Sequence, residues 1–134
     1  MSPKLTDEQL DREVLFHLKL HLGAAHPIGR WAIVMKIFGA GAAVPRSDSN
    51  IYDRQVRESV ARLRKGGLLV CDVGDGSGKF LAVSAQEYQA FRQYYGAQAF
   101  EKLEILRAMD RAADEQFPNR LQPSLFDLSE ARKA

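Results

Sequence analysis

Apolar side chains recur at helical spacing in the first part of the chain. Leu10, Val14 and Leu18 follow one another every four residues, directly after the segment TDEQ, which has the pattern of a capping box. This pattern predicts a first helix over residues 6–22, closed by the glycine that follows. The apolar segment RWAIVMKIF predicts a second, short helix over residues 30–38, with Trp31, Phe38 and either Val34 or Met35 facing inward.

A third amphipathic segment covers residues 51–65. Val56, Val60 and Leu63 lie on one narrow face of the expected helix, which we expect to be buried. The opposite face is polar and largely basic, and we expect it to point away from the core: Arg54, Arg57, Glu58, Ala61 and Lys65.

Loop and strand signals flank this third helix. The preceding segment GAGAAVPRSDSN predicts a loop, in which Asp48 or Ser49 is placed to cap the helix. A glycine pair then ends the helix and leads into the strand-like residues 68–73. A glycine-rich turn and a second strand at residues 79–83 complete a β-hairpin.

A long helix is expected next, because SAQE has the pattern of a capping box and apolar residues then recur at helical spacing up to Phe117. Gly96 is a position at which this helix can kink or divide. The expected fold is mainly α with a small β-hairpin (α+β). We expect a domain at residues 1–83, a C-terminal helix at 84–117 as a possible dimerisation element, and a flexible tail at 118–134.

Bulk composition adds few constraints. The chain has 134 residues and a formal net charge of only +2, so nucleic-acid binding depends on where the charges lie. The single cysteine, Cys71, allows no intramolecular disulfide, which favours a reducing compartment. Neither a secretion signal nor a membrane-spanning stretch is recognisable, so we expect a cytoplasmic protein that does not bind membranes.

The order helix, helix, loop, helix, glycine pair and hairpin is that of a winged helix-turn-helix. The segment DRQVRESVARLRKGGLLV resembles the recognition helix and first wing strand of bacterial, phage or mobile-element members of that family, although the loop before it is long for a compact turn. The resemblance covers about residues 10–83 and implies a nucleoid-associated protein that binds double-stranded DNA, with its third helix in the major groove. The candidates for base contacts are Tyr52, Arg54, Gln55 and Arg57. The candidates for backbone contacts are Arg46, Arg62, Arg64, Lys65 and Lys79.

A short motif in the tail carries a second resemblance. Gln122, Ser124, Leu125 and Phe126 belong to QPSLF, which is similar to the Q-L-[SD]-L-F peptide by which bacterial replication and repair proteins bind the sliding clamp. Pro123 stands where that peptide prefers Leu. The resemblance implies that the tail docks through its Leu-Phe pair, with the glutamine as a polar anchor. The alternative is that these apolar side chains fold back and cover the domain.

These observations predict a transcriptional regulator or a replication-associated accessory factor. The alternative is a winged-helix interaction module that recruits the clamp or another partner, and an antitoxin-like protein is a third possibility. No catalytic set is recognisable, so we expect no enzyme and no cofactor. GDGSGK is one residue short of a phosphate-binding loop, and Phe80 replaces its metal-binding hydroxyl. His17 and His21 are four residues apart but lack a convergent acidic or cysteine ligand, so no metal site is expected.

Overall fold

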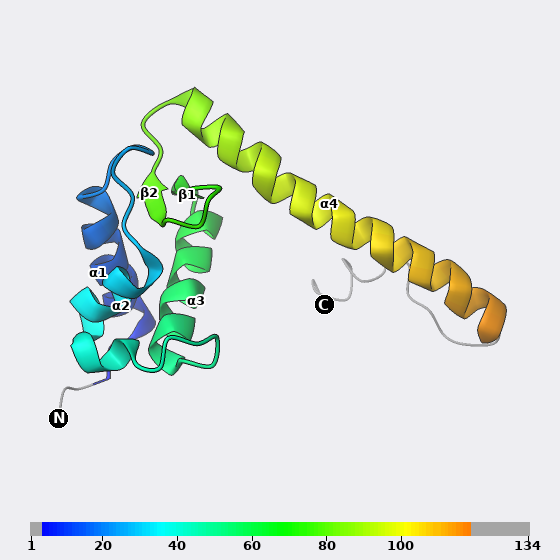
Figure 1. Ribbon diagram of the computed structural model, residues 1–134, viewed down its shortest axis with the longest axis horizontal. Coiled ribbons are helices and arrows are strands. Elements are labelled where there is room, and N and C mark those ends of the chain that lie inside the picture. The colour runs from blue at the N-terminus through cyan, green and yellow to red at the C-terminus, as the bar shows by residue number, and fades with distance from the viewer. Residues whose placement is uncertain (1–3, 119–134) are drawn as a thin grey trace. The chain divides into compact units, whose positions relative to one another are not determined.

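The computed structural model describes residues 4–118 and is mainly helical, with a small two-stranded antiparallel sheet (Figure 1). The expected α+β class is confirmed. The chain divides into two compact units, Met1–Tyr95 and Gly96–Ala134. The elements in chain order are α1 (Asp7–Lys19), α2 (Arg30–Phe38), the 3-10 helix η1 (Ala40–Ala43), α3 (Ile51–Lys65), β1 (Val70–Asp72), β2 (Lys79–Leu81) and α4 (Ala85–Gln116).

Helix α1 begins with the expected capping box. The Thr6 hydroxyl accepts a hydrogen bond from the Gln9 backbone N–H at 3.1 Å, and the Gln9 side chain accepts one from the Thr6 N–H at 2.9 Å. The helix ends at Lys19 rather than near residue 22. The chain leaves the helix early because the following residues pair with β2. The Leu81 N–H donates a hydrogen bond to the His21 carbonyl, and the Gly23 N–H donates one to the Leu81 carbonyl.

Helices α2 and α3 have the bounds that the sequence predicts. Of the two alternatives in α2, Val34 is buried, as is Ile33 beside it, whereas Met35 is exposed. The expected cap of α3 was wrong: Asn50, and neither Asp48 nor Ser49, caps the helix. The Asn50 Oδ1 atom accepts hydrogen bonds from the backbone N–H groups of Tyr52 and Asp53, at 2.9 and 3.0 Å. Its amide also donates to the Ala42 carbonyl, so burial of Asn50 fixes the loop to the helix.

The core of the first unit lies between the three N-terminal helices and the base of the hairpin. The expected inward faces of α1 and α3 are confirmed, because Val14 and Leu18 are fully buried and Val56, Val60 and Leu63 are buried too. Full burial of one such aliphatic side chain contributes about 1.5–3 kcal/mol. The other members of the apolar core are Leu10, Ile28, Ile33, Val34, Ala42, Ala43 and Val70.

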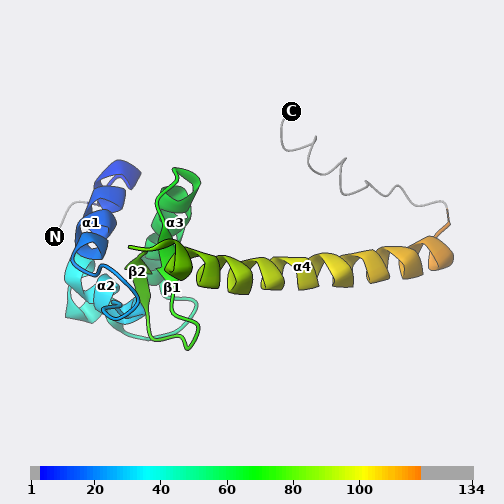
Figure 2. The same cartoon turned by 90° about the horizontal axis from the view of Figure 1, so that it is seen from above.

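The hairpin strands are shorter than expected, at three residues each, and pair with Cys71 opposite Phe80. The other edge of β2 pairs with the segment between α1 and α2, where Ile28 and Lys79 exchange two backbone hydrogen bonds of 2.8 and 2.9 Å. Gly78 lies so close to this segment that a Cβ atom would stand 2.3 Å from the Ile28 oxygen. Figure 2 shows the hairpin between α1 and the first turns of α4.

Helix α4 is continuous through Gly96, so this glycine does not divide it, and it contains no buried residue. The Ser84 hydroxyl accepts from the Glu87 N–H at 3.1 Å, which is half of the expected capping box. The Glu87 carboxylate does not complete the box, because it accepts from the N–H groups of Val83 and Ala24 at 2.9 and 2.7 Å. Within residues 4–118, no helix combines the length and the hydropathy that crossing a bilayer requires.

Candidate nucleic-acid interface

One face of α3 is open to solvent and carries most of its charge. Inward packing of Val56, Val60 and Leu63 turns the opposite face outward. We call this the outer face of α3, and its members are exposed as expected: Arg54, Arg57, Glu58, Ala61 and Lys65. The small side chain of Ala61 at the centre of this face allows a partner to approach the helix backbone closely.

A buried carboxylate organises the N-terminal half of this face. The side chain of Asp53 is 1% exposed and accepts hydrogen bonds from Arg30 of α2 at 2.7 and 2.5 Å. Arg57 donates to the same carboxylate from one turn further along α3, at 2.9 Å. Burial disfavours the charged form of Asp53, but the hydrogen bonds and charge of Arg30, and then those of Arg57, outweigh it and lower its pKa below the ordinary value.

This network engages Arg57 without covering it. A second donor of Arg57 reaches the Asp48 backbone oxygen at 3.2 Å, while 48% of its side chain stays exposed. Arg30 also contacts the Asp48 carboxylate, at 2.9 Å, and its pKa is raised by its hydrogen bonds to Asp53 and Asp48. The network therefore holds Arg57 in one orientation and offsets part of its charge.

Arg62 lies on the side of α3 that packs against α1. Its guanidinium makes hydrogen bonds of 2.8–3.1 Å to the Asp11 carboxylate, which also accepts from the Ser59 hydroxyl at 2.6 Å. The hydrogen bond with Arg62 lowers the pKa of Asp11, and the same bond raises the pKa of Arg62. The structure therefore separates Arg62 from the outer face and places it in the contact between two helices.

Arg64 and Lys79 meet at Asp72, on the hairpin. The Lys79 ammonium lies 2.5 Å from one Asp72 oxygen, and Arg64 Nη2 lies 3.3 Å from the other. Arg64 also donates to the Val70 carbonyl at 2.8 Å. Arg64 and Lys79, which were both expected to contact the DNA backbone, are therefore close to each other. The Asp72 carboxylate offsets part of the charge of each.

The other expected contact residues surround the start of α3. The ring of Tyr52 packs against Phe38 of α2, with centroids 4.9 Å apart, while the residue stays 37% exposed. Arg46 is exposed in the preceding loop, and its nearest described partner is the Met35 sulfur at 3.9 Å. Gln55 is half-buried between Arg54 and Val56. The structure thus brings Arg54, Arg57 and Lys65 onto one face, whereas Arg46 lies in the loop before α3 and Tyr52 packs against α2.

A groove lies between the outer face of α3, the hairpin and the beginning of α4. It consists of two adjoining hollows of about 460 and 370 Å³, which share Arg57 and Lys79 among their lining residues. We call this pair of hollows the basic groove. Tyr94 lines the first hollow and Tyr95 lines the second, together with Lys65.

Sequence reasoning missed four of these residues. Asp53 precedes Val56 by three residues and therefore falls on the buried face of the helix. Because a buried carboxylate is normally paired with a cation, this position predicts an ion pair. Arg30 carries no comparable signal, because its pairing depends on how α2 packs on α3. Tyr95 was predicted only as part of the apolar pattern of the long helix, and Tyr94 is not part of that pattern.

Two further expectations concern other parts of the chain. The clamp-like residues Gln122, Ser124, Leu125 and Phe126 lie outside the described residues, so that interpretation stays a prediction. Among residues 4–118, no group of three histidine, cysteine, aspartate or glutamate side chains is arranged to hold a metal ion. His21 instead uses its Nδ1 atom in a 2.9 Å hydrogen bond with the His26 carbonyl group.

Comparison with known proteins finds no protein family, no characterised sequence and no solved structure that matches this chain.

Proposed function

We propose that this protein binds double-stranded DNA as a winged helix-turn-helix, with the outer face of α3 in the major groove and the hairpin as the wing. The observation that carries the proposal is the exposure of one face of α3 that bears Arg54, Arg57 and Lys65 around the small Ala61. A helix with such a face fits the major groove, where guanidinium groups read guanine and ammonium groups bind phosphates.

The ion pairs narrow the set of proposed contacts. Arg54, Gln55 and Arg57 are the best candidates for base edges, and Tyr52 is restricted by its packing on Phe38. Lys65 and Arg46 are the best candidates for phosphates. Arg62, Arg64 and Lys79 form ion pairs within the domain, so a phosphate would have to compete with Asp11 or Asp72 for them.

The proposal is tested by selection of bound sequences from a random duplex library, followed by gel shifts of the full chain with the enriched duplex. Enrichment of one motif, bound more tightly than unrelated duplexes, supports a specific reader. Binding that is equal on all duplexes and falls steeply with salt supports a sequence-independent binder. Failure to retain any duplex at low salt contradicts the proposal.

We also propose that α4 forms a homodimer through its C-terminal part. Beyond Tyr95 the helix exposes apolar side chains at helical spacing, namely Phe100, Leu103, Leu106, Met109 and Phe117. In proteins, most of the stability of a helix comes from packing of such an apolar face against a partner. A second copy covers it with the same surface and supplies a second DNA-binding face.

The second candidate function is a protein interaction module, which could serve transcription or replication by recruiting a partner such as the sliding clamp. The observation that favours it is the same exposed stripe on α4, because contiguous exposed apolar surface marks interaction sites. A chain that retains no DNA but still binds a partner through α4 or its tail would support this candidate.

A further inference from the structure

The basic groove has three walls, and the third is supplied by α4. Arg57 and Lys65 belong to α3, and Lys79 belongs to the hairpin. The remaining wall consists of Tyr94 and Tyr95, whose side chains are 44% and 51% exposed. Two phenol groups thus stand in a groove that is lined by five cationic side chains and two carboxylates, although the phenols come from an element outside the expected winged-helix region. The cations are Arg30, Arg57, Arg64, Lys65 and Lys79, and the carboxylates are Asp48 and Asp72.

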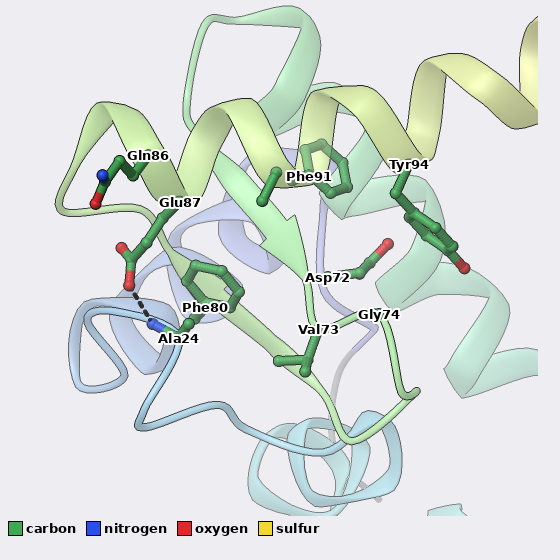
Figure 3. Close-up of a pocket in the computed structure, with 10 residues that line it drawn as sticks. Ala24, Asp72, Val73, Gly74, Phe80, Gln86, Glu87, Phe91 and Tyr94 are labelled. Carbon is green, nitrogen blue, oxygen red and sulfur yellow. Dashed lines mark hydrogen bonds between the residues drawn. The ribbon is translucent and has the colours of Figure 1, made fainter.

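The first turns of α4 are held firmly enough to define this wall. At one end, the Glu87 carboxylate accepts from the N–H groups of Val83 and Ala24, and these two hydrogen bonds keep its pKa below the ordinary value. One turn later, Phe91 lies beside Phe80 of β2 in an open apolar hollow of about 430 Å³ (Figure 3).

Arg64 provides the attachment nearest the tyrosines. Its guanidinium lies 5.0 Å from the ring centroid of Phe91 and 5.5 Å from that of Tyr95. These are distances of cation–π contact, and Arg64 is itself fixed to the Val70 carbonyl of β1. In Figure 3, Tyr94 lies at the opposite end of the hollow from the Glu87–Ala24 hydrogen bond, beyond Asp72. The position of the Tyr95 ring therefore follows from α3 and the hairpin, and Tyr94 is its neighbour on the same turn of α4.

We propose that Tyr94 and Tyr95 bind the sugar-phosphate backbone of the duplex that the outer face of α3 engages. This inference rests on the proposed function and adds a third contact element to it. A phenol donates a hydrogen bond to a phosphate oxygen, and the cations across the groove attract that phosphate electrostatically. The contact carries no sequence information, so it raises affinity for every duplex alike.

The test is a fluorescence titration of the full chain with a labelled duplex of mixed sequence, repeated over a range of salt concentrations. The variant Tyr94→Phe/Tyr95→Phe removes only the two hydroxyl groups and keeps the ring beneath Arg64. We expect this variant to weaken binding about tenfold, which is the size of effect seen when a hydrogen bond to a charged group is lost. The slope of log K against log salt should not change, because no cationic side chain is removed. Lys65→Gln should instead reduce that slope by about one.

Tyr88→Phe is the matched control, because Tyr88 lies on the same helix but does not line the basic groove. It should bind like the wild type, and circular dichroism should show equal helix content in all variants. If the wild type binds and the double phenylalanine variant binds equally well, this inference is overturned and the proposed function stands. If the wild type retains no duplex, both are overturned.

Discussion

Arg30 of α2 and Asp53 of α3 form a two-point ion pair, with Nε–Oδ1 and Nη2–Oδ2 distances of 2.7 and 2.5 Å. The carboxylate is buried, and a second arginine, Arg57, shares it from the proposed DNA-binding face. One carboxylate therefore joins two helices and also orients a proposed contact residue. Loss of its charge should affect both the stability of the domain and DNA binding.

Asp53→Asn should lower the free energy of unfolding by about 2 kcal/mol. Breaking a fully buried pair costs about 3–5 kcal/mol, and we expect less here because both arginines are more than a third exposed. Chemical denaturation followed by circular dichroism measures the change. Asp48→Asn is the control: its carboxylate also contacts Arg30 but is 93% exposed, so the change should stay within about 0.5 kcal/mol. Equal effects of the two variants would contradict this role for Asp53.

The same pair predicts the direction of a pH dependence. The folded pKa of Asp53 lies below the ordinary value of 3.8, so the native state binds this proton less readily than the unfolded chain. The stabilisation is complete above the unfolded pKa and is lost as pH falls through the folded pKa. The difference in stability between wild type and Asp53→Asn should therefore be constant near neutral pH and shrink as pH falls through and below 3.8. A difference that grows towards acid pH would show that Asp53 is not charged in the folded state.

Much of the fold follows from local patterns. The bounds of α2 and α3 match the prediction because apolar spacing and glycine stops act within a few residues. The early end of α1 was not predictable in this way, since it depends on pairing between residues 21–23 and Leu81. The same limit applies to the site: the exposed face of α3 was predicted, whereas Arg62 is drawn to Asp11, 51 positions away, and no local pattern encodes that pairing.

Arg57→Ala should weaken binding to the selected duplex and relax its specificity. Loss of one good base contact costs about 1–3 kcal/mol, and competitive gel shifts against single-base variants of the site measure both effects. Arg12→Ala is the matched control, because it removes the same charge from an exposed position on α1. Equal losses in the two variants would mean that only overall charge matters.

Leu106→Asp should dissociate the proposed homodimer, because it places a charge within the exposed apolar stripe of α4. Sedimentation equilibrium should give the mass of a single chain for the variant and twice that mass for the wild type. Ala108→Asp adds the same charge two residues away, on the opposite side of the helix, and should stay dimeric. A monomeric wild type at micromolar concentration would refute dimerisation.

The tail motif makes a separate prediction. The full chain should retain a bacterial sliding clamp in a pull-down, and Leu125→Ala/Phe126→Ala should abolish retention, because these two side chains are expected to fill the clamp pocket. Asp127→Ala, just outside the motif, serves as the control and should have no effect. Equal retention by wild type and the double variant would remove the clamp from consideration.

Strand β2 is hydrogen-bonded along both of its edges, to β1 on one side and to the segment around Ile28 on the other. A hinge at its base would have to open both sets of bonds at once. If this hairpin adapts to a partner, the change in conformation is therefore confined to the few turn residues at its tip. The length of that turn sets how far the tip can move.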